Sequence, residues 1–263
     1  MAFAYSLCSS SKGNSTYIGD EKNGILVDAG LSLRSFKQKM DFRGIDYSAV
    51  KGIFITHEHT DHIKGLKTIG KLLNVPIYSS RKTIEHLIKN DMLPPGGKAI
   101  ELNRKVADMG NMGVTSFTTP HDSVHSLGFK MEFTDGKTAV VCTDLGCVTQ
   151  EVSTNIMGSN FILLESNYDE EMLRMGAYPS FLKQRIRSSV GHLSNENCAK
   201  TLVELLQSGT TKFMLGHLSE QNNLPQLAMQ CALAELLHAG SELNRDYILS
   251  VAKAQSIGEV MEI

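Results

Sequence analysis

The sequence has no long hydrophobic run and no excess of charge of either sign. No apolar stretch approaches the roughly 18 residues that span a membrane, and residues 1–6 lack the charged and apolar regions of a secretory signal. The formal net charge is −2 over 263 residues, which excludes a generally basic surface, so any contact with nucleic acid must use a local patch. We therefore expect a cytoplasmic protein with no membrane association.

Cysteine is scarce and irregularly placed. The chain has five cysteines, an odd number with no C-x-x-C pair: Cys8, Cys142, Cys147, Cys198 and Cys231. This pattern excludes a disulfide framework and a structural zinc knot, and it predicts reduced, mostly buried thiols. Internal repeats, low-complexity segments and linkers are also missing. The length suits one large core, so we expect a single domain over residues 1–263.

The apolar pattern predicts short strands that are followed by helices in each half of the chain. Strands are expected over residues 3–8, 16–18, 24–28, 50–55, 114–117, 127–133, 138–142, 160–165 and 213–215. Helices are expected over residues 32–40, 63–73, 195–206 and 225–238. This order predicts an α/β fold in which two sheets pack together and helices cover their outer faces.

The stretch FITHEHTDHIKG at residues 54–65 contains three histidines and two acids within six positions. His57 and His59 are two residues apart, so on an extended backbone their side chains leave on one side. Asp61 and His62 lie at the turn into the next helix, where free N–H groups favour a carboxylate. Imidazoles and carboxylates bind metals readily. The H-x-H-x-D-H spacing therefore predicts a site for two adjacent metal ions.

Further candidate residues follow predicted strands elsewhere in the chain. His121 comes directly after Pro120, which ends a strand, and Asp144 closes an apolar run. His192 and His217 lie in two copies of the tetrapeptide Gly-His-Leu-Ser that are 25 residues apart. Taken singly, each histidine is more often a surface or core residue. Their shared position at strand ends makes them candidates for the metal site.

Together these motifs resemble the metallo-β-lactamase fold hydrolase superfamily over residues 7–224. The resemblance implies a four-layer αββα sandwich with two mixed sheets and outer helices. It also implies two divalent metal ions, with Asp144 as the bridge between them and Asp61 as both ligand and catalytic residue. One ion would be bound by His57, His59 and His121, and the other by Asp61, His62 and His217.

This sequence differs from several subgroups of the superfamily, and these differences reduce the number of subgroups that it resembles. A carboxylate at Asp144, where the lactamases commonly have cysteine, favours phosphoester and thioester hydrolases. The segment from Asp144 to His192 is too short for the extra domain of the CPSF-like nucleases, and the long arm of the RNase Z type is missing. The remaining group is that of YycJ (WalJ), which this chain matches at residues 9–15, 26–31, 164–169, 191–195 and 217–222. That group is regarded as 5′-to-3′ exonucleases on duplex DNA, so the resemblance implies DNA as the substrate.

The expected mechanism is hydrolysis of a phosphodiester. Two divalent ions that share a water lower its pKa from ~15.7 towards ~7, and the resulting hydroxide would attack phosphorus. His192 matches an additional histidine of the family that is not a ligand. We expect it to donate a proton to the leaving oxygen or to hold a phosphate. The alternative is that it belongs to the loop before a helix and has no catalytic role.

Five residues are expected to bind the substrate. The basic residues Lys183, Arg185 and Arg187 precede His192 and can bind phosphates at the entry to the site. A short basic run can equally be a solvated face. Ser11 and Asn14 lie in a polar turn over residues 9–14 and are expected to contact the substrate as well.

Two other functions remain open. One is a phosphodiesterase for a cyclic or nucleotide-like small molecule, which is favoured if the basic run lies away from the metals. The other is a thioester hydrolase of the glyoxalase type, which needs the same ligands but not the basic residues. The nitrogen and oxygen ligands suit zinc, manganese or iron, and the oligomeric state is left open.

Overall fold

A computed structural model describes residues 1–103, 105–254 and 258–263, and its strands form two seven-stranded sheets. The first sheet has the order β14 (Glu259–Glu262), β1 (Phe3–Ser10), β2 (Gly13–Gly19), β3 (Gly24–Val27), β4 (Val50–Phe54), β5 (Ile77–Ser79) and β6 (Ala99–Glu101). The second has the order β13 (Ile248–Val251), β12 (Lys212–Gly216), β11 (Phe161–Glu165), β10 (Thr138–Cys142), β9 (Leu127–Phe133), β8 (Met112–Thr118) and β7 (Ala107–Asp108).

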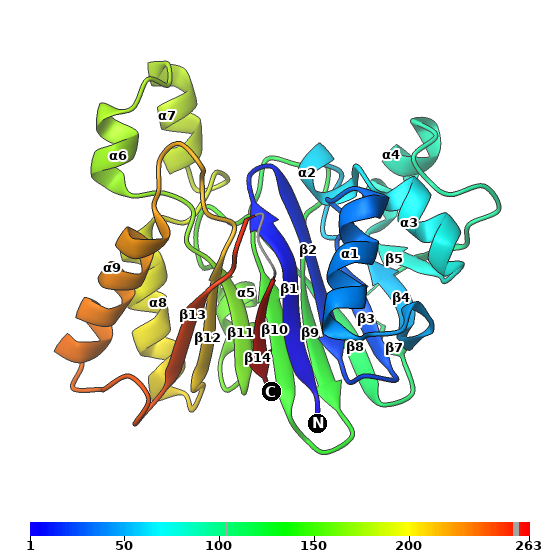
Figure 1. Ribbon diagram of the computed structural model, residues 1–263. Coiled ribbons are helices and arrows are strands. Elements are labelled where there is room, and N and C mark those ends of the chain that lie inside the picture. The colour runs from blue at the N-terminus through cyan, green and yellow to red at the C-terminus, as the bar shows by residue number, and fades with distance from the viewer. Residues whose placement is uncertain (104, 255–257) are drawn as a thin grey trace.

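The helices cover the outer faces of the two sheets (Figure 1). The first sheet is covered by α1 (Leu33–Arg43), α3 (Leu66–Leu73) and α4 (Arg81–Lys89), with α2 (Thr60–Ile63) and the short helix η1 (Tyr47–Ala49) beside them. The second is covered by α5 (Gln150–Ile156), α8 (Asn195–Gln207) and α9 (Pro225–His238). The helices α6 (Glu170–Met175) and α7 (Ser180–Arg187) stand above one edge, at the top left of Figure 1.

Three apolar clusters separate the four layers. The central cluster joins side chains of both sheets, such as Val27 and Phe54 from the first and Phe129 and Val141 from the second. The other two clusters lie between each sheet and its helices. The αββα sandwich expected from the sequence is therefore confirmed. Within the described part of the chain, no helix is long and apolar enough to cross a membrane.

Each sheet combines an antiparallel and a parallel part. Strands β3 to β6 are parallel to one another, as are β10 to β13, while the hairpins β1–β2 and β8–β9 are antiparallel. The carboxyl ends of parallel strands meet at one edge of a sheet, which is where α/β proteins commonly place their sites.

Two predicted segments differ from the structure by more than the position of their ends. The helix expected over residues 63–73 is divided into α2 and α3, because Gly65 packs against the backbone of residues 29–31. A Cβ on Gly65 would lie 1.9 Å from the carbonyl oxygen of Leu31. The polar turn expected over residues 9–14 is mostly strand, which leaves only Ser11 and Lys12 as the turn between β1 and β2.

Candidate metal centre

The polar residues of the site lie at the carboxyl ends of strands in both sheets. Asp28 follows β3, His57 follows β4, Asp144 follows β10, and His217 follows β12. Glu165 is the last residue of β11. Because the apolar body of each strand is buried in the core, these end residues are fixed by the sheets themselves.

Three of these residues have a backbone conformation that is rare for side chains other than glycine. The φ angles are 60° for Asp28, 57° for Asp144 and 54° for His217. Such strained residues persist only where surrounding contacts hold them, and they cluster at functional sites. Here the backbone N–H of Asp28 donates to the carbonyl oxygen of Phe54 at 2.8 Å, and that of His217 donates to Ser9 Oγ at 2.7 Å.

One group of donors consists of His57, His59 and His121. Each offers a ring nitrogen, and these nitrogens lie within 4.8 Å of one another. The His57 ring is fully buried, and its Nε2 has no hydrogen-bond partner within the described structure. Burial disfavours a charge on this ring and lowers its pKa well below the ordinary value. The ring is therefore neutral, and a lone pair is available to a metal.

A second group consists of Asp61, His62 and His217. Asp61 Oδ2 lies 3.3 Å from His62 Nε2 and 3.4 Å from His217 Nε2. Burial opposes a charge on His217, but the carboxylates of Asp144, Asp61 and Glu165 outweigh it and raise the pKa of this ring to about 10. A metal that binds here must therefore displace a proton from His217.

Asp144 lies between the two groups. Its Oδ2 is 3.3 Å from His62 Nε2, and its Oδ1 is 3.5 Å from His217 Nε2 and 3.7 Å from His121 Nε2. The Oδ2 atom is buried and has no hydrogen-bond partner within the described structure. Asp144 Oδ2 and His57 Nε2 are thus two buried atoms without a hydrogen-bond partner. Each could offer a lone pair to a bound cation. The site therefore suits divalent metals, and it brings together all seven residues that were predicted as ligands.

Sequence reasoning missed two buried carboxylates that orient the histidine rings. Glu165 Oε1 lies 2.8 Å from the Nδ1 atoms of both His192 and His217. Asp28 Oδ2 lies 2.7 Å from His62 Nδ1. Carboxylates behind a ligand histidine fix its orientation and raise its basicity. The sequence did contain a signal for these two acids. Glu165 ends an apolar strand and Asp28 directly follows one, and Asp144 has a similar position two residues after β10.

His192 lies beside the donors and is more open than they are. Its side chain is 23% exposed, whereas that of His217 is 2% exposed. The centre of its ring is 5.1 Å from that of His121 and 5.3 Å from that of His217. Its backbone N–H donates to the carbonyl oxygen of Ile186 at 2.9 Å, which ties this residue to α7.

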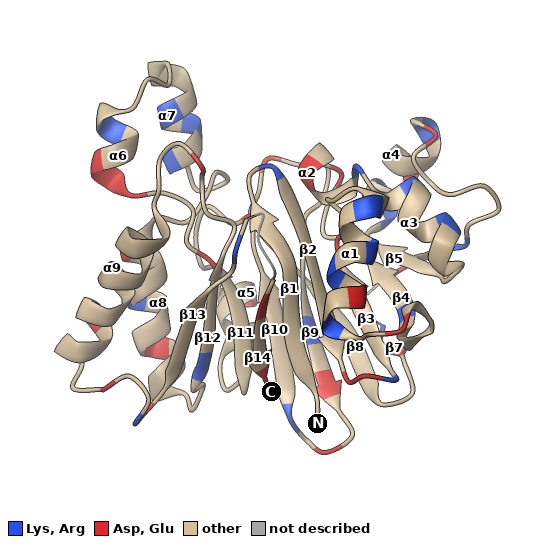
Figure 2. Cartoon of the chain, in the orientation of Figure 1, with Lys and Arg blue, Asp and Glu red and all other residues tan. Residues whose placement is uncertain are grey.

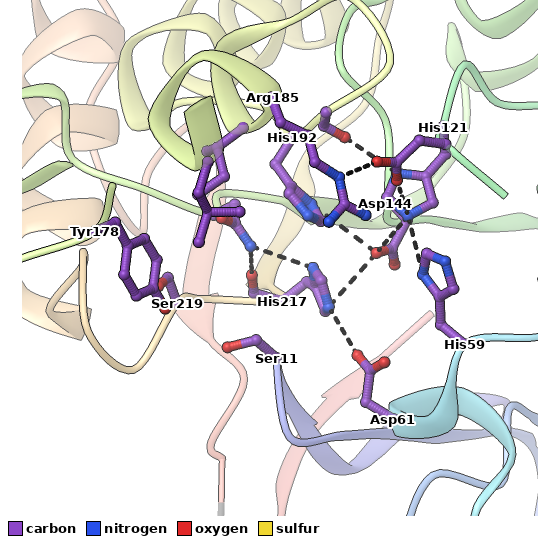
Figure 3. A pocket seen from close by; sticks show the side chains of 15 residues that line it. Ser11, His59, Asp61, His121, Asp144, Tyr178, Arg185, His192, His217 and Ser219 are labelled. Carbon is purple, nitrogen blue, oxygen red and sulfur yellow. Dashed lines mark hydrogen bonds and ion pairs between the residues drawn. The ribbon is translucent and has the colours of Figure 1, made fainter. Parts of the chain in front are cut away.

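A cavity of about 230 Å³ opens over the donors. Figure 3 shows His59, His121, Asp61, Asp144 and His217 around a common centre, with Arg185 and His192 beside them and Tyr178 at the other end. Leu182 and Ile186 of α7 also line the cavity. One wall is therefore polar and charged, and the part formed by α7 is partly apolar.

The structure separates the predicted substrate-binding residues. Ser11 and Arg185 line the cavity, and Arg185 is paired with Asp122. Asn14 is buried behind the ligands instead, where its Nδ2 lies 3.2 Å from Asp61 Oδ2 and 3.1 Å from His62 Nε2. It supports the metal centre and does not line the cavity.

The other two basic residues of α7 also lie outside the cavity lining. Lys183 Nζ donates to the carbonyl oxygen of Arg174 at 2.8 Å, and Arg187 is paired with Glu170 at 2.8 Å. The expectation that the whole basic run lines the entry therefore needs correction. The physical reason is the helix, because residues 183 and 187 are four apart and share one face of α7, whereas residue 185 lies on the opposite face.

Known proteins resemble this chain over the part that carries the metal-binding residues. The family model described as the β-lactamase superfamily domain matches residues 23–217. Exodeoxyribonuclease YycJ of Bacillus anthracis is 38% identical over 225 residues, which cover 84% of each chain. Exodeoxyribonuclease WalJ of Streptococcus pneumoniae is 34% identical over 257 residues, which cover 94% of this chain and 93% of that protein. Among solved structures, the metallo-β-lactamase fold protein YhfI of Bacillus subtilis matches 100% of both chains with a TM-score of 0.73 and 16% identity, which concerns the fold alone.

Proposed function

The chain belongs to the β-lactamase superfamily and, within it, to the family of YycJ and WalJ, and from this membership we propose that it is a dinuclear metal-dependent nuclease. As a member of the superfamily with a cluster of histidine and aspartate donors, it is a metal-dependent hydrolase. We propose DNA as the substrate and degradation from an end, because both relatives are named exodeoxyribonucleases. The choice of duplex DNA and of the 5′ end is our proposal from the resemblance of the sequence to the YycJ group.

The observation that carries the proposal is the pair of donor groups on either side of Asp144. His57, His59 and His121 would hold one divalent ion, and the other group would hold a second. Zinc, manganese and iron all suit such nitrogen and oxygen ligands. When bound, these ions supply activation of water and neutralisation of the charge on phosphate oxygens.

The side chains around the ions position the substrate and move a proton. Glu165 occupies Nδ1 of His192, so the Nε2 atom of that ring is left to donate a proton to the leaving oxygen. The Arg185 guanidinium would bind a phosphate oxygen, and for this it would exchange its partner Asp122 for the substrate. The Ser11 hydroxyl faces the same cavity and can donate a hydrogen bond.

We also infer that residues 1–263 form one domain, because both sheets contribute to the central apolar cluster and neither could keep that face buried alone. We propose the cytoplasm as the place of action, since that is where a bacterial-type exodeoxyribonuclease would meet duplex DNA. The five cysteines of the chain are all free thiols, which agrees with a reducing compartment.

The test compares several substrates with a single metal, manganese or zinc. The substrates are linear 5′-phosphorylated duplex DNA, nicked circles, closed circles and a small cyclic phosphodiester. We expect mononucleotides from the linear duplex and no cleavage of the closed circle. Cleavage of the small ester alone would refute the nuclease proposal.

One observation favours a small-molecule phosphodiesterase as the second candidate. The cavity is only about 230 Å³ in volume, and Arg185 is the one residue of the predicted basic run that lines it. A small cyclic or nucleotide-like ester would fit this space without needing further phosphate contacts. The substrate panel above distinguishes the two functions directly.

A further inference from the structure

Helix α7 forms one wall of the cavity over the metal donors, which we call the metal cavity. Leu182, Arg185 and Ile186 of this helix line it, and so does Tyr178, which lies just before the helix. Residues that are three or four apart share one face of a helix, so these side chains form a single face of α7. In Figure 3, Tyr178 and Arg185 lie at opposite ends of this wall. The wall is therefore apolar and aromatic between its two ends, with a cation at one of them.

The opposite face of α7 holds the helix in place against α6. Lys183 Nζ donates to the carbonyl oxygen of Arg174, and Arg187 is paired with Glu170. Figure 2 shows these helices together, with basic residues on α7 and residues of both signs on α6. The two contacts fix which side of α7 is directed at the metal cavity.

Phe181 is the aromatic residue of α7 itself, and it lies at the rim of the metal cavity. It comes one helical turn before Arg185 and three residues after Tyr178, but it does not line the cavity. The residue is 72% exposed. Single exposed apolar residues are common on protein surfaces, so exposure alone assigns no role to it. Its place beside the entry to the metal cavity is what gives this ring a possible partner.

The metal cavity is too small for a base pair. Its volume is about 230 Å³, which is below the roughly 300–1,000 Å³ of pockets that hold a drug-sized ligand. The metal donors lie at its floor, where Asp144 is 1% and His217 is 2% exposed. A phosphodiester must therefore enter the cavity to reach them, and the space admits about one nucleotide.

This restriction has a consequence for a duplex substrate. The terminal nucleotide of the strand that is cut must leave its complementary base before it enters the metal cavity. Opening a base pair costs free energy, because both pairing and stacking are lost. Stacking of a base on an aromatic side chain recovers part of that cost and does not depend on the base. An exposed aromatic ring at the rim is in the place where such stacking would be useful.

We propose that Phe181 separates the two strands at the end of a duplex. Its ring covers the last intact base pair, while the freed nucleotide enters the metal cavity along Tyr178 and Leu182. The nearby Arg185 then binds the phosphate of that nucleotide. This inference rests on the proposed nuclease function and explains how a small cavity can act on duplex DNA.

Three variants of Phe181 separate stacking from simple apolar contact. Phe181→Ala removes the ring, Phe181→Leu keeps an apolar side chain without a ring, and Phe181→Trp keeps an aromatic surface. Met175→Ala is the matched control, because Met175 is also 72% exposed, lies on the neighbouring helix α6 and does not line the metal cavity. Metal content and Tm of each variant show whether the fold and the metal centre are intact.

The measurement compares two substrates that differ only in their ends. One is a blunt 5′-phosphorylated duplex, and the other is the same duplex with mismatched, already open terminal pairs. The ratio of kcat/KM for the blunt end to that for the open end should fall about tenfold in Phe181→Ala. Phe181→Leu should show a similar fall, whereas Phe181→Trp and Met175→Ala should keep the ratio of the unaltered protein.

A fluorescent base provides a second measurement. A terminal 2-aminopurine beside a linkage that cannot be hydrolysed should become brighter when the unaltered protein binds the blunt duplex, because the base leaves its stack. Phe181→Ala should give a smaller increase at saturating protein.

Several results would overturn this role for Phe181. An unchanged ratio in Phe181→Ala would show that the ring does not take part in opening the duplex and is free for another partner, such as a protein. A full ratio in Phe181→Leu, or an equal fall in Met175→Ala, would show that aromatic stacking is not the cause. If the unaltered protein cleaves neither blunt nor open DNA, the proposed nuclease function itself fails, and the role of Phe181 fails with it.

Discussion

The ring of His217 is held by contacts on every side. Its Nδ1 lies 2.8 Å from Glu165 Oε1, its Nε2 lies 3.4 Å from Asp61 Oδ2, and its backbone carbonyl accepts from Asn167 Nδ2 at 2.7 Å. The residue keeps an unfavourable φ of 54° under these constraints. A ligand that is oriented before the metal arrives loses little entropy when the metal binds. The same reasoning applies to His62, which is held by Asp28 and Thr56.

The roles of His192 and Asp144 can be separated by substitution. His192→Ala should keep the metal content while hydrolysis of a phosphodiester falls by a factor on the order of 10²–10⁴, as for the loss of a positioned proton donor. Asp144→Ala should lose both metal and activity, because its carboxylate lies between the two donor groups. Elemental analysis and steady-state kinetics measure the two effects. Loss of a metal ion from His192→Ala would show that His192 is a ligand, as a member of the further donor group of Asp144, Glu165, His192 and His217, whose ligand atoms lie within 4.8 Å of one another.

At the scale of elements, the site depends on the close packing of the segment after β3 against α2. The backbone N–H of Ala29 donates to the carbonyl oxygen of His62 at 2.8 Å, and that of Gly65 donates to Ala29 at 2.9 Å. Gly30 lies in this segment, in direct contact with the backbone of Asp61. A four-residue helix such as α2 is too short to be stable alone. Its position, and that of its two ligands, is therefore set by the segment that packs on it.

Gly30→Ala should disturb the metal centre from outside it. The added Cβ would lie 1.6 Å from the Asp61 carbonyl oxygen, so α2 must move and take Asp61 and His62 with it. We expect a loss of metal affinity together with reduced thermal stability. Gly96→Ala is the control, because its Cβ meets nothing within 4 Å and only the φ of +72° opposes it. That change should cost about 1 kcal/mol and leave metal affinity unchanged. Equal metal affinity in both variants would contradict the proposed dependence on packing.

Helix α7 presents one of its three basic residues to the metal cavity. Arg185→Gln should raise KM by about tenfold or more for both DNA and a minimal phosphodiester, because it removes a charge-assisted hydrogen bond to the phosphate. Lys183→Gln makes the same change of charge on the same helix, and its KM should stay within about twofold of the original value. Steady-state kinetics on both substrates provide the comparison. If the two variants are equally impaired, the basic residues act as one strip and the orientation of Arg185 is not decisive.

At the scale of the whole molecule, the metal centre joins the two sheets. His57, Asp61 and His62 come from the segments after β4 of the first sheet, while His121, Asp144 and His217 come from the second. The central apolar cluster holds the sheets together at their faces, and the donors meet at their common edge. Metal ions bound there would connect the two halves of the fold at a second place.

Metal binding should therefore stabilise the whole chain. Removal of metal with a chelator should lower Tm, and addition of manganese or zinc should restore it in a concentration-dependent way. A metal at 100 times its Kd adds about 2.7 kcal/mol to the free energy of unfolding. Asp144→Ala should lack most of this response, while His86→Ala, on α4 and outside the cavity lining, should keep it. A Tm that is indifferent to metal in the unaltered protein would rule out tight binding at this site.

The amino-acid sequence alone determined the central features of the fold and of the candidate site. The predicted bounds of β9, β10 and α9 agree with the structure, because apolar periodicity and a proline at the start of α9 are local signals. The H-x-H-x-D-H motif is also local, since its donors are separated by one or two residues. The more distant donors His121, Asp144 and His217 were found because each follows a strand, and parallel strands bring their carboxyl ends together.

Tertiary structure decided what depends on contacts between distant segments. The pairing of Glu165 with two histidines that are 27 and 52 residues away is not encoded in any local spacing. The burial of Asn14 follows from the packing of β2 against α2, and the direction of Arg185 from the way α7 stands over the cavity. Local spacing fixes the identity and order of the ligands, whereas orientation, burial and the shape of a cavity arise only when the sheets and helices pack.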